Sequence, residues 1–241
     1  MTADGHPGPM SCVDRGLTAA LLEIHSSLLL HFGDPEWWPG DTPFEISVGA
    51  VLTQNTTWKN VEMVIGDLKG RNMMSPRRIC GCDGEELAEL IKAAGYYNQK
   101  SGYLRNLCGF IENELEGEIS SLELLPLETA RMKLLDIKGI GPETADSILC
   151  YAAGQKTLVV DQYTKRILSR YLPAEMVETY ERDIATCEKL RSLLMRCMEG
   201  DNQIYNRFHA LIVLLGKDLC KPRPKCGSCP LAGSCRTGVS I

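Results

Sequence analysis

Four cysteines near the end of the chain have the types and spacing of a metal site. Cys220, Cys226, Cys229 and Cys235 lie in a segment that contains three prolines and few apolar residues. Such a segment cannot order itself around a core of its own, so we expect a bound metal centre; the alternative is four unliganded core cysteines. Four thiolates suit either tetrahedral zinc or an iron–sulfur cluster, and ligand type does not separate the two.

The same segment is locally basic. Five cations face a single acid, Asp218, between residues 217 and 236, a balance of 5 − 1 = +4. A phosphate backbone could bind there, although solvated charge around a metal loop explains the same pattern. The five cations are Lys217, Lys221, Arg223, Lys225 and Arg236.

A second chemical candidate is Asp161, which directly follows the apolar residues 158–160. If that run is buried, the carboxylate is partly desolvated. Asp161 could serve only as the N-cap of the helix that follows, but capping and catalysis do not exclude each other.

A third candidate is the turn between Leu135 and Ala145, which contains Gly139 and Gly141 and is followed by Pro142. Proline is favoured in the first turn of a helix, and N–H groups beside a helix N-terminus can bind a phosphate. No strand precedes the turn, which argues against a dinucleotide fold. The pattern favours a hairpin between two helices that holds DNA backbone without reading its sequence.

Helices must position these residues, because the apolar pattern is helical almost throughout. Leu17, Leu21, Ile24 and Leu28 form one stripe, and a second runs from Trp58 to Leu68. A third runs from Ile204 to Leu215, with Gly216 at the expected helix stop. We therefore predict an all-α fold with short loops.

The length and composition of the chain further limit which kinds of protein it can be. The chain has 241 residues, enough for one large domain or two small ones, and a net charge of 26 − 31 = −5, so any nucleic-acid surface must be local. The eleven cysteines are an odd number and cannot all pair. No apolar run approaches the ~20 residues of a membrane span, and the start lacks a signal peptide. We expect a cytoplasmic protein.

Together, the hairpin, the Val160-Asp161 pair and the cysteine tail resemble the helix-hairpin-helix DNA glycosylases of the endonuclease III superfamily. The resemblance implies two helical domains, with DNA and the damaged base bound in the cleft between them. One would comprise residues 1–41 and 156–241, with a cluster loop at 217–236. The other would be a helical bundle, residues 42–155, that ends in the helix-hairpin-helix at about 131–153.

The resemblance also assigns roles. Asp161 would be the catalytic aspartate, and the four cysteines would hold a [4Fe–4S] cluster, although the first cysteine gap is five residues where the family usually has six. The DNA backbone would contact Lys138, Gly139, Gly141 and Thr144. A monovalent cation would bind the carbonyls of Leu135, Ile137 and Ile140.

One position departs from the bifunctional members of the family. These carry a Schiff-base lysine two positions after the second glycine of the hairpin, and here that position is Glu143. A carboxylate cannot form an imine with the sugar, so we expect no AP lyase activity. Lys138 and Lys165 lie nearby in sequence but outside the motif position.

Within the superfamily, the chain looks most similar to the 3-methyladenine DNA glycosylases. That likeness implies a base pocket of Trp37, Trp38 and Trp58, although each tryptophan could simply pack in the core. It also implies that Gln54 and Tyr96 fill the gap left by a flipped nucleotide. We expect His209, between Phe208 and Leu211, to be structural.

The predicted protein is a monomeric, nucleoid-associated glycosylase in base excision repair. It would flip alkylated purines such as 3-methyladenine out of double-stranded DNA and hydrolyse the N-glycosidic bond. The alternatives are a glycosylase and AP lyase for oxidised pyrimidines, a mismatch-specific glycosylase, and a DNA-binding redox sensor without catalysis.

Overall fold

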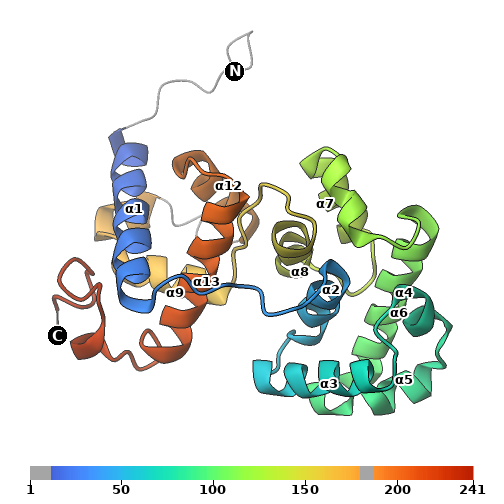
Figure 1. Cartoon of the computed structure of the whole chain (residues 1–241). Helices are drawn as coiled ribbons and strands as arrows, with labels where there is room; N and C mark the ends of the chain where they lie inside the picture. The colour runs from blue at the N-terminus through green and yellow to red at the C-terminus, as the bar shows by residue number, and fades with distance from the viewer. Residues whose placement is uncertain (1–11, 180–186, 241) are drawn as a thin grey trace, which may run out of the picture. The chain divides into compact units, whose positions relative to one another are not determined.

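The computed structural model describes residues 12–179 and 187–240, and within these ranges every regular element is a helix (Figure 1). The predicted all-α class is therefore confirmed. None of the described helices is both long and apolar enough to cross a membrane. The chain divides into two compact units. Of the described residues, one unit comprises 12–36, 158–179 and 187–240, and the other is continuous from Trp37 to Thr157.

The continuous unit is a bundle in which α6 (Tyr97–Glu114) packs against two short helices, α4 (Pro76–Gly81) and α5 (Gly84–Leu90). Its core is made of aliphatic side chains such as Val51, Leu68 and Leu104, which are fully buried. The remaining elements are α2 (Pro43–Leu52), α3 (Trp58–Gly70), η1 (Lys92–Ala94), η2 (Ile119–Leu124), α7 (Leu127–Leu135), α8 (Pro142–Ser147) and η3 (Ile148–Ala152).

The helices of this unit begin where local chemistry favours it. Thr42 caps α2 by accepting the N–H of Glu45, and Pro43 occupies the first turn. Ser75 and Asp83 cap α4 and α5 in the same way. The predicted stripe from Trp58 to Leu68 is the inner face of α3, on which Val61 and Leu68 are fully buried.

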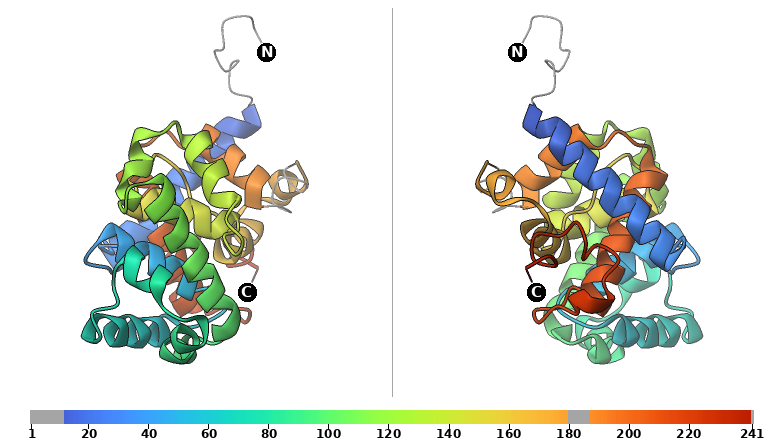
Figure 2. Two further views of the ribbon diagram at one scale, coloured as in Figure 1. Left: turned by 90° about the vertical axis from the view of Figure 1, so that its right-hand side faces the viewer. Right: turned by 90° about the vertical axis from the view of Figure 1, so that its left-hand side faces the viewer.

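The second unit joins the two ends of the chain. Its core contains the predicted stripe of α1 (Cys12–Phe32), whose four leucine and isoleucine side chains are at most 1% exposed. Helix α1 packs against α13 (Asn202–Asp218) and α12 (Cys187–Cys197), as Figure 1 shows. Two further helices are α9 (Gln162–Tyr171) and α10 (Ala174–Thr179). The segment after α13 is irregular apart from one short turn, η4 (Cys226–Ser228), and forms the red loop in Figure 2.

The expected helix stop at Gly216 is wrong, because α13 continues to Asp218. Gly216 serves packing instead. A Cβ atom at this position would collide with the ring of Tyr163 on α9. The glycine therefore permits the close approach of α9 and α13, which together position the residues described next.

Candidate active site

Asp161 lies between a buried extended segment and a helix. The preceding residues, Leu158, Val159 and Val160, are at most 2% exposed, and Asp161 is the N-cap of α9. Its Oδ1 accepts hydrogen bonds from the Thr164 N–H at 2.8 Å and the Thr164 hydroxyl at 2.9 Å. The capping role that the sequence suggested is thus real, and it uses one carboxylate oxygen.

The other carboxylate oxygen faces His209. Oδ2 of Asp161 lies 3.7 Å from His209 Nε2, which comes from the middle of α13, and both side chains are buried. His209 is interior, as expected, but it also contacts the candidate catalytic group, which its flanking apolar residues did not reveal. Only the packing of α13 on α9 brings the two together.

The environment keeps Asp161 ionised. Burial raises the pKa of this carboxyl, but the neighbouring imidazole of His209 and the two bonds from Thr164 lower it more. The net pKa of Asp161 is below the ordinary aspartate value. A buried carboxylate that stays negative can stabilise a developing positive charge.

Aromatic rings gather in the other unit. Trp38 is central: its ring centroid lies 5.6 Å from that of Trp58, 5.8 Å from that of Trp37 and 5.3 Å from that of Tyr151. The three tryptophans are half-buried, and Trp38 and Trp58 also pack against the core of this unit. Hence the structure brings the predicted pocket tryptophans together.

Tyr151 is an aromatic member that the sequence did not indicate. It lies in η3, a π-helical turn that continues α8, and it is 9% exposed. Such turns often occur at functional sites. The indoles also reach the backbone of α2, because a Cβ atom at Gly49 would lie only 3.1 Å from Trp38 Nε1. We refer to Trp37, Trp38, Trp58 and Tyr151 as the aromatic cluster.

The predicted hairpin is present between α7 and α8. Gly139 has a φ of 102°, and a Cβ atom there would collide with the ring of Tyr103 on α6. The turn is also held by the side-chain amide of Asn106, which donates to the Lys138 carbonyl at 3.0 Å. Lys138 and Gly141 are exposed, as contacts to DNA require.

A buried ion pair joins the two helices of the hairpin. Arg131 of α7 donates to Asp146 of α8 through two bonds of 2.7 and 3.1 Å, and both side chains are about as buried as core residues. Two parallel bonds fix direction as well as distance. The ion pair therefore helps to fix the orientation of α7 relative to α8, the two helices that flank the turn.

Gln54 and Thr144 have partners that the sequence did not suggest. The Gln54 amide donates to the Gly139 carbonyl and to the Thr144 hydroxyl, each at 3.0 Å. Thr144 is buried. Gln54 would have to break both bonds to enter DNA, and Thr144 would have to become accessible to reach a phosphate.

Tyr96, the second residue predicted to fill the DNA gap, is exposed to solvent. It is 64% exposed and has a φ of 47°, in the left-handed region, at the turn before α6. An exposed ring on a tight turn is free to stack with a base.

Glu143 is exposed in the first turn of α8. The position of the family's lysine nucleophile is therefore on the surface of the hairpin and is occupied by a carboxylate.

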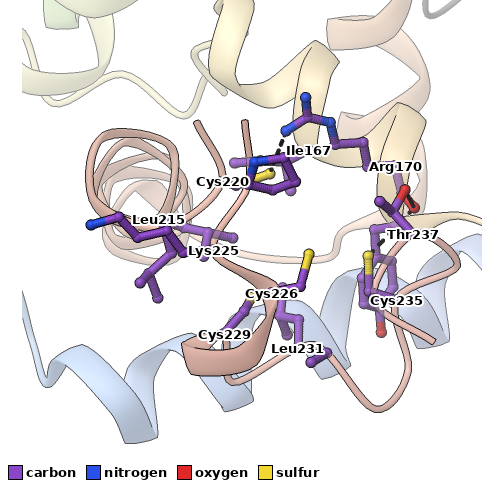
Figure 3. Close-up of a pocket in the computed structure, with 15 residues that line it drawn as sticks. Ile167, Arg170, Leu215, Cys220, Lys225, Cys226, Cys229, Leu231, Cys235 and Thr237 are labelled. Atoms are coloured by element: carbon purple, nitrogen blue, oxygen red, sulfur yellow. Dashed lines mark hydrogen bonds between the residues drawn. The ribbon is translucent and has the colours of Figure 1, made fainter. Parts of the chain in front are cut away.

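The four cysteines of the tail line a single hollow (Figure 3). Its other walls are mainly apolar and include Ile167, Leu215 and Leu231. Burial raises the pKa of Cys229, and the neighbouring thiols raise it further against the lowering effect of the Leu231 backbone N–H.

Arginines of α9 hold the tail in place. Arg170 donates to Cys220 Sγ at 3.4 Å and to the carbonyls of Lys221 and Pro222, while Arg166 donates to the Cys220 carbonyl at 2.9 Å. Arg236 donates to the carbonyls of Ser169 and Leu172, so this cation anchors the tail as well. Lys221, Arg223 and Lys225 are exposed.

The donor atoms of the hollow fit a thiolate-bound metal centre. Four thiols from one short segment line it, and thiolates are ligands both of structural zinc and of iron–sulfur clusters. Cys220, Cys226, Cys229 and Cys235 are the residues that would hold such a centre. Within residues 12–179 and 187–240, no three His, Cys, Asp or Glu side chains converge closely enough to hold a single metal ion.

Comparison with known proteins places this geometry in context. A family model of HhH-GPD superfamily base excision DNA repair proteins matches residues 48–192. A protein from Methanocaldococcus jannaschii, provisionally named a DNA repair glycosylase, is 38% identical over 89% of this chain and 95% of its own length. A thymine-DNA glycosylase from Aeropyrum pernix is 27% identical over 94% of this chain and 97% of its own.

Among solved structures, the chain is similar to the H. pylori 3-methyladenine DNA glycosylase bound to 1,N6-ethenoadenine. The identity is 31%, the TM-score is 0.61, and the alignment covers 85% of this chain and 97% of the other.

Proposed function

This chain belongs to the HhH-GPD superfamily of base excision DNA repair proteins, and we propose that it is a monofunctional DNA glycosylase for alkylated purines such as 3-methyladenine. That it is a DNA glycosylase acting on double-stranded DNA follows from the family. The substrate class and the absence of strand cleavage are our proposal. The aromatic cluster around Trp38 is the observation that carries it.

The chemistry of the substrate supports this choice. Alkylation at N3 or N7 puts a positive charge on the purine, and a cation against aromatic faces gains ~0.5–2 kcal/mol. The same charge makes the base a better leaving group, so a strong general acid is not needed. The aromatic cluster, including Tyr151, would hold the cationic base after it has been flipped out of the duplex.

Asp161 would supply the rest of the catalysis. Its Oδ1 is occupied by Thr164, so Oδ2 is the oxygen proposed to face the sugar as positive charge develops at its anomeric carbon. Oδ2 would also orient or deprotonate the water that completes hydrolysis. His209 would keep Asp161 ionised through this step.

The other assigned residues would bind the DNA around the lesion. The hairpin, with Lys138, Gly139, Gly141 and Thr144, would hold the backbone, and the carbonyls of Leu135, Ile137 and Ile140 would bind a monovalent cation. Gln54 and Tyr96 would occupy the gap in the stack. A cluster bound by the four cysteines would order the tail so that Lys221, Arg223 and Lys225 meet a phosphate backbone.

The decisive experiment measures base release from methylated DNA, with 3-methyladenine and 7-methylguanine followed separately. The Asp161→Asn variant should lose on the order of a hundredfold in rate, because asparagine caps a helix as well as aspartate but carries no charge. Asp201→Asn is the matched control, since Asp201 caps α13 in the same unit. Base release by neither wild type nor Asp161→Asn would favour a DNA-binding or redox module without this chemistry, and equal, measurable release by both would show that Asp161 is not the catalytic group.

A test of the aromatic cluster uses the charge of the lesion. Replacing Trp38 by Ala should slow release of a cationic methylpurine about three- to thirty-fold more than release of a neutral damaged purine, in line with the loss of a cation–π contact. An equal loss on both substrates would contradict recognition by charge.

A mismatch-specific glycosylase activity is the second candidate, because the Aeropyrum relative is a thymine-DNA glycosylase. Duplexes with thymine or adenine mispairs, offered beside alkylated DNA, separate the two activities. Oxidised pyrimidine substrates test the remaining enzymatic alternative: borohydride trapping of the protein on such DNA would refute the monofunctional assignment.

A further inference from the structure

A lysine with no assigned role is buried in the continuous unit. Lys100, in the first turn of α6, is 2% exposed. Its Nζ donates to the carbonyl of Leu52 and to that of Ala94, both at 2.8 Å. Burying an ammonium group costs free energy unless hydrogen bonds offset the loss of hydration, so the buried position of Lys100 requires an explanation.

The two carbonyls share one feature: each is at the C-terminal end of a helical segment. Leu52 is the last residue of α2, and Ala94 is the last residue of η1. Terminal carbonyls lack partners inside the helix and carry the negative end of its dipole. Lys100 thus caps two helical ends with one cation, and burial lowers its pKa to about 8.

The segments that follow these two ends carry the two residues assigned to the DNA gap. Gln54 is in the turn directly after Leu52, and Tyr96 follows Ala94 and Gly95. Both turns contain a non-glycine residue in the left-handed region, Asn55 with a φ of 53° and Tyr96 with a φ of 47°. Such conformations persist only where the surroundings hold them.

We propose that Lys100 is a positioning residue that ties the Gln54 and Tyr96 turns to one point, so that both side chains enter the DNA stack in a fixed relation. This proposal rests on the proposed function only in that Gln54 and Tyr96 contact the gap opposite or beside a flipped base. Lys100 itself touches neither DNA nor the base.

The test compares Lys100→Met with wild type on two substrates. In one, the methylated purine is paired, and in the other it lies opposite an abasic site and is already unpaired. Because misplacement of contact groups by about 1 Å can cost a hundredfold, we expect a ten- to hundredfold slower single-turnover release from the paired lesion. The rate of release from the unpaired lesion should fall less than about threefold, because flipping an unpaired base requires no base pair to be broken.

The control variant is Lys69→Met. Lys69 also makes two short bonds, to Asp41 at 2.8 Å and Glu45 at 2.7 Å, in the same unit but away from both turns. It should not distinguish the two substrates. If Lys100→Met lost activity equally on both, its role would be general stability and the proposal would be overturned.

A double-mutant cycle covers the case in which Lys100→Met folds poorly. Lys100→Arg keeps the positive charge and the hydrogen-bond donors. It should therefore recover part of the rate of release from the paired lesion that Lys100→Met loses. In a Gln54→Ala, Tyr96→Ala background, either change at Lys100 should cost little more, because residues that act together are not additive. A full additional loss would overturn the proposal.

An assay without chemistry separates failure of this proposal from failure of the proposed function. The fluorescence of 2-aminopurine opposite a stable abasic analogue reports entry of side chains into the stack. Wild type should raise it and Lys100→Met should not, whichever damaged base the enzyme excises. Wild type that raises it yet releases no methylpurine would leave the role of Lys100 supported and refute only the alkylpurine assignment.

Discussion

The two carboxylate oxygens of Asp161 have different partners. Oδ1 begins α9 through Thr164, and Oδ2 faces His209. The helix cap fixes the carboxylate in direction, which a reaction needs, while burial makes its charge costly. His209 offsets that cost, and in the proposed mechanism it would act through Asp161 as a positioning residue.

Replacing His209 by Gln should move the acid limb of base release to higher pH. With the histidine present, the pKa of Asp161 is below its ordinary value, so its contribution to stability and activity is full at neutral pH and is lost as pH falls through that lowered pKa. Without it, burial dominates and the pKa rises. A pH–rate profile of both proteins measures the shift, and an unchanged limb would contradict the role of His209.

Position 143 provides a gain-of-function prediction. Glu143 occupies the place of the family's Schiff-base lysine and is exposed on the hairpin. Glu143→Lys should therefore allow an imine with the sugar after base release. Borohydride should trap the variant on lesion DNA but not the wild type, and Glu143→Gln is the control. Trapping of the wild type would mean that another lysine supplies lyase activity.

The hairpin depends on neighbours outside its own motif. Tyr103 of α6 lies under Gly139, Asn106 binds the turn, and the Arg131–Asp146 pair fixes the two helices. The two glycines of the motif are consequently not equivalent, although they look alike in the sequence.

Gly139→Ala should damage the hairpin, while Gly141→Ala should be tolerated. Gly139 has a φ of 102° and Tyr103 fills the place of a side chain, whereas Gly141 has a φ of −92° and open space around its Cβ position. A strained conformation of this kind costs about 1–3 kcal/mol, before the clash is counted. DNA affinity and thermal unfolding of both variants test this, and equal effects would contradict the steric explanation.

Each unit of the molecule has its own hydrophobic core, and the described part of the tail beyond α13 contributes only one buried residue, Leu231, to the core of the second unit. It is held by arginines of α9 and by whatever the four cysteines bind. The basic residues of the tail can meet DNA only if this loop is ordered.

Loss of the bound cluster should therefore weaken DNA binding more than it weakens the fold of the continuous unit. Cys226→Ser should lower iron and sulfide content, reduce DNA affinity on the order of tenfold, and make binding less dependent on salt, because fewer phosphates are contacted. Cys80→Ser, in the other unit, is the control. Full affinity without bound iron would show that the cysteines serve another purpose.

Local patterns in the sequence determined a large part of this protein. The apolar stripes of α1 and α3, the Gly139–Pro142 turn and the cap at Asp161 depend on neighbours within a few residues, and all are present in the structure. The family resemblance added a hypothesis about which of these positions carry chemistry.

Only the tertiary structure decided which side chains meet across long separations. The contacts of His209 with Asp161, of Tyr151 with Trp38, of Lys100 with two helix ends and of Gln54 with the hairpin join residues far apart in the chain. Gly216 was misinterpreted for the same reason, since its role is set by Tyr163. Periodicity and spacing report which face of a helix is buried, but the partner on that face depends on how the helices pack.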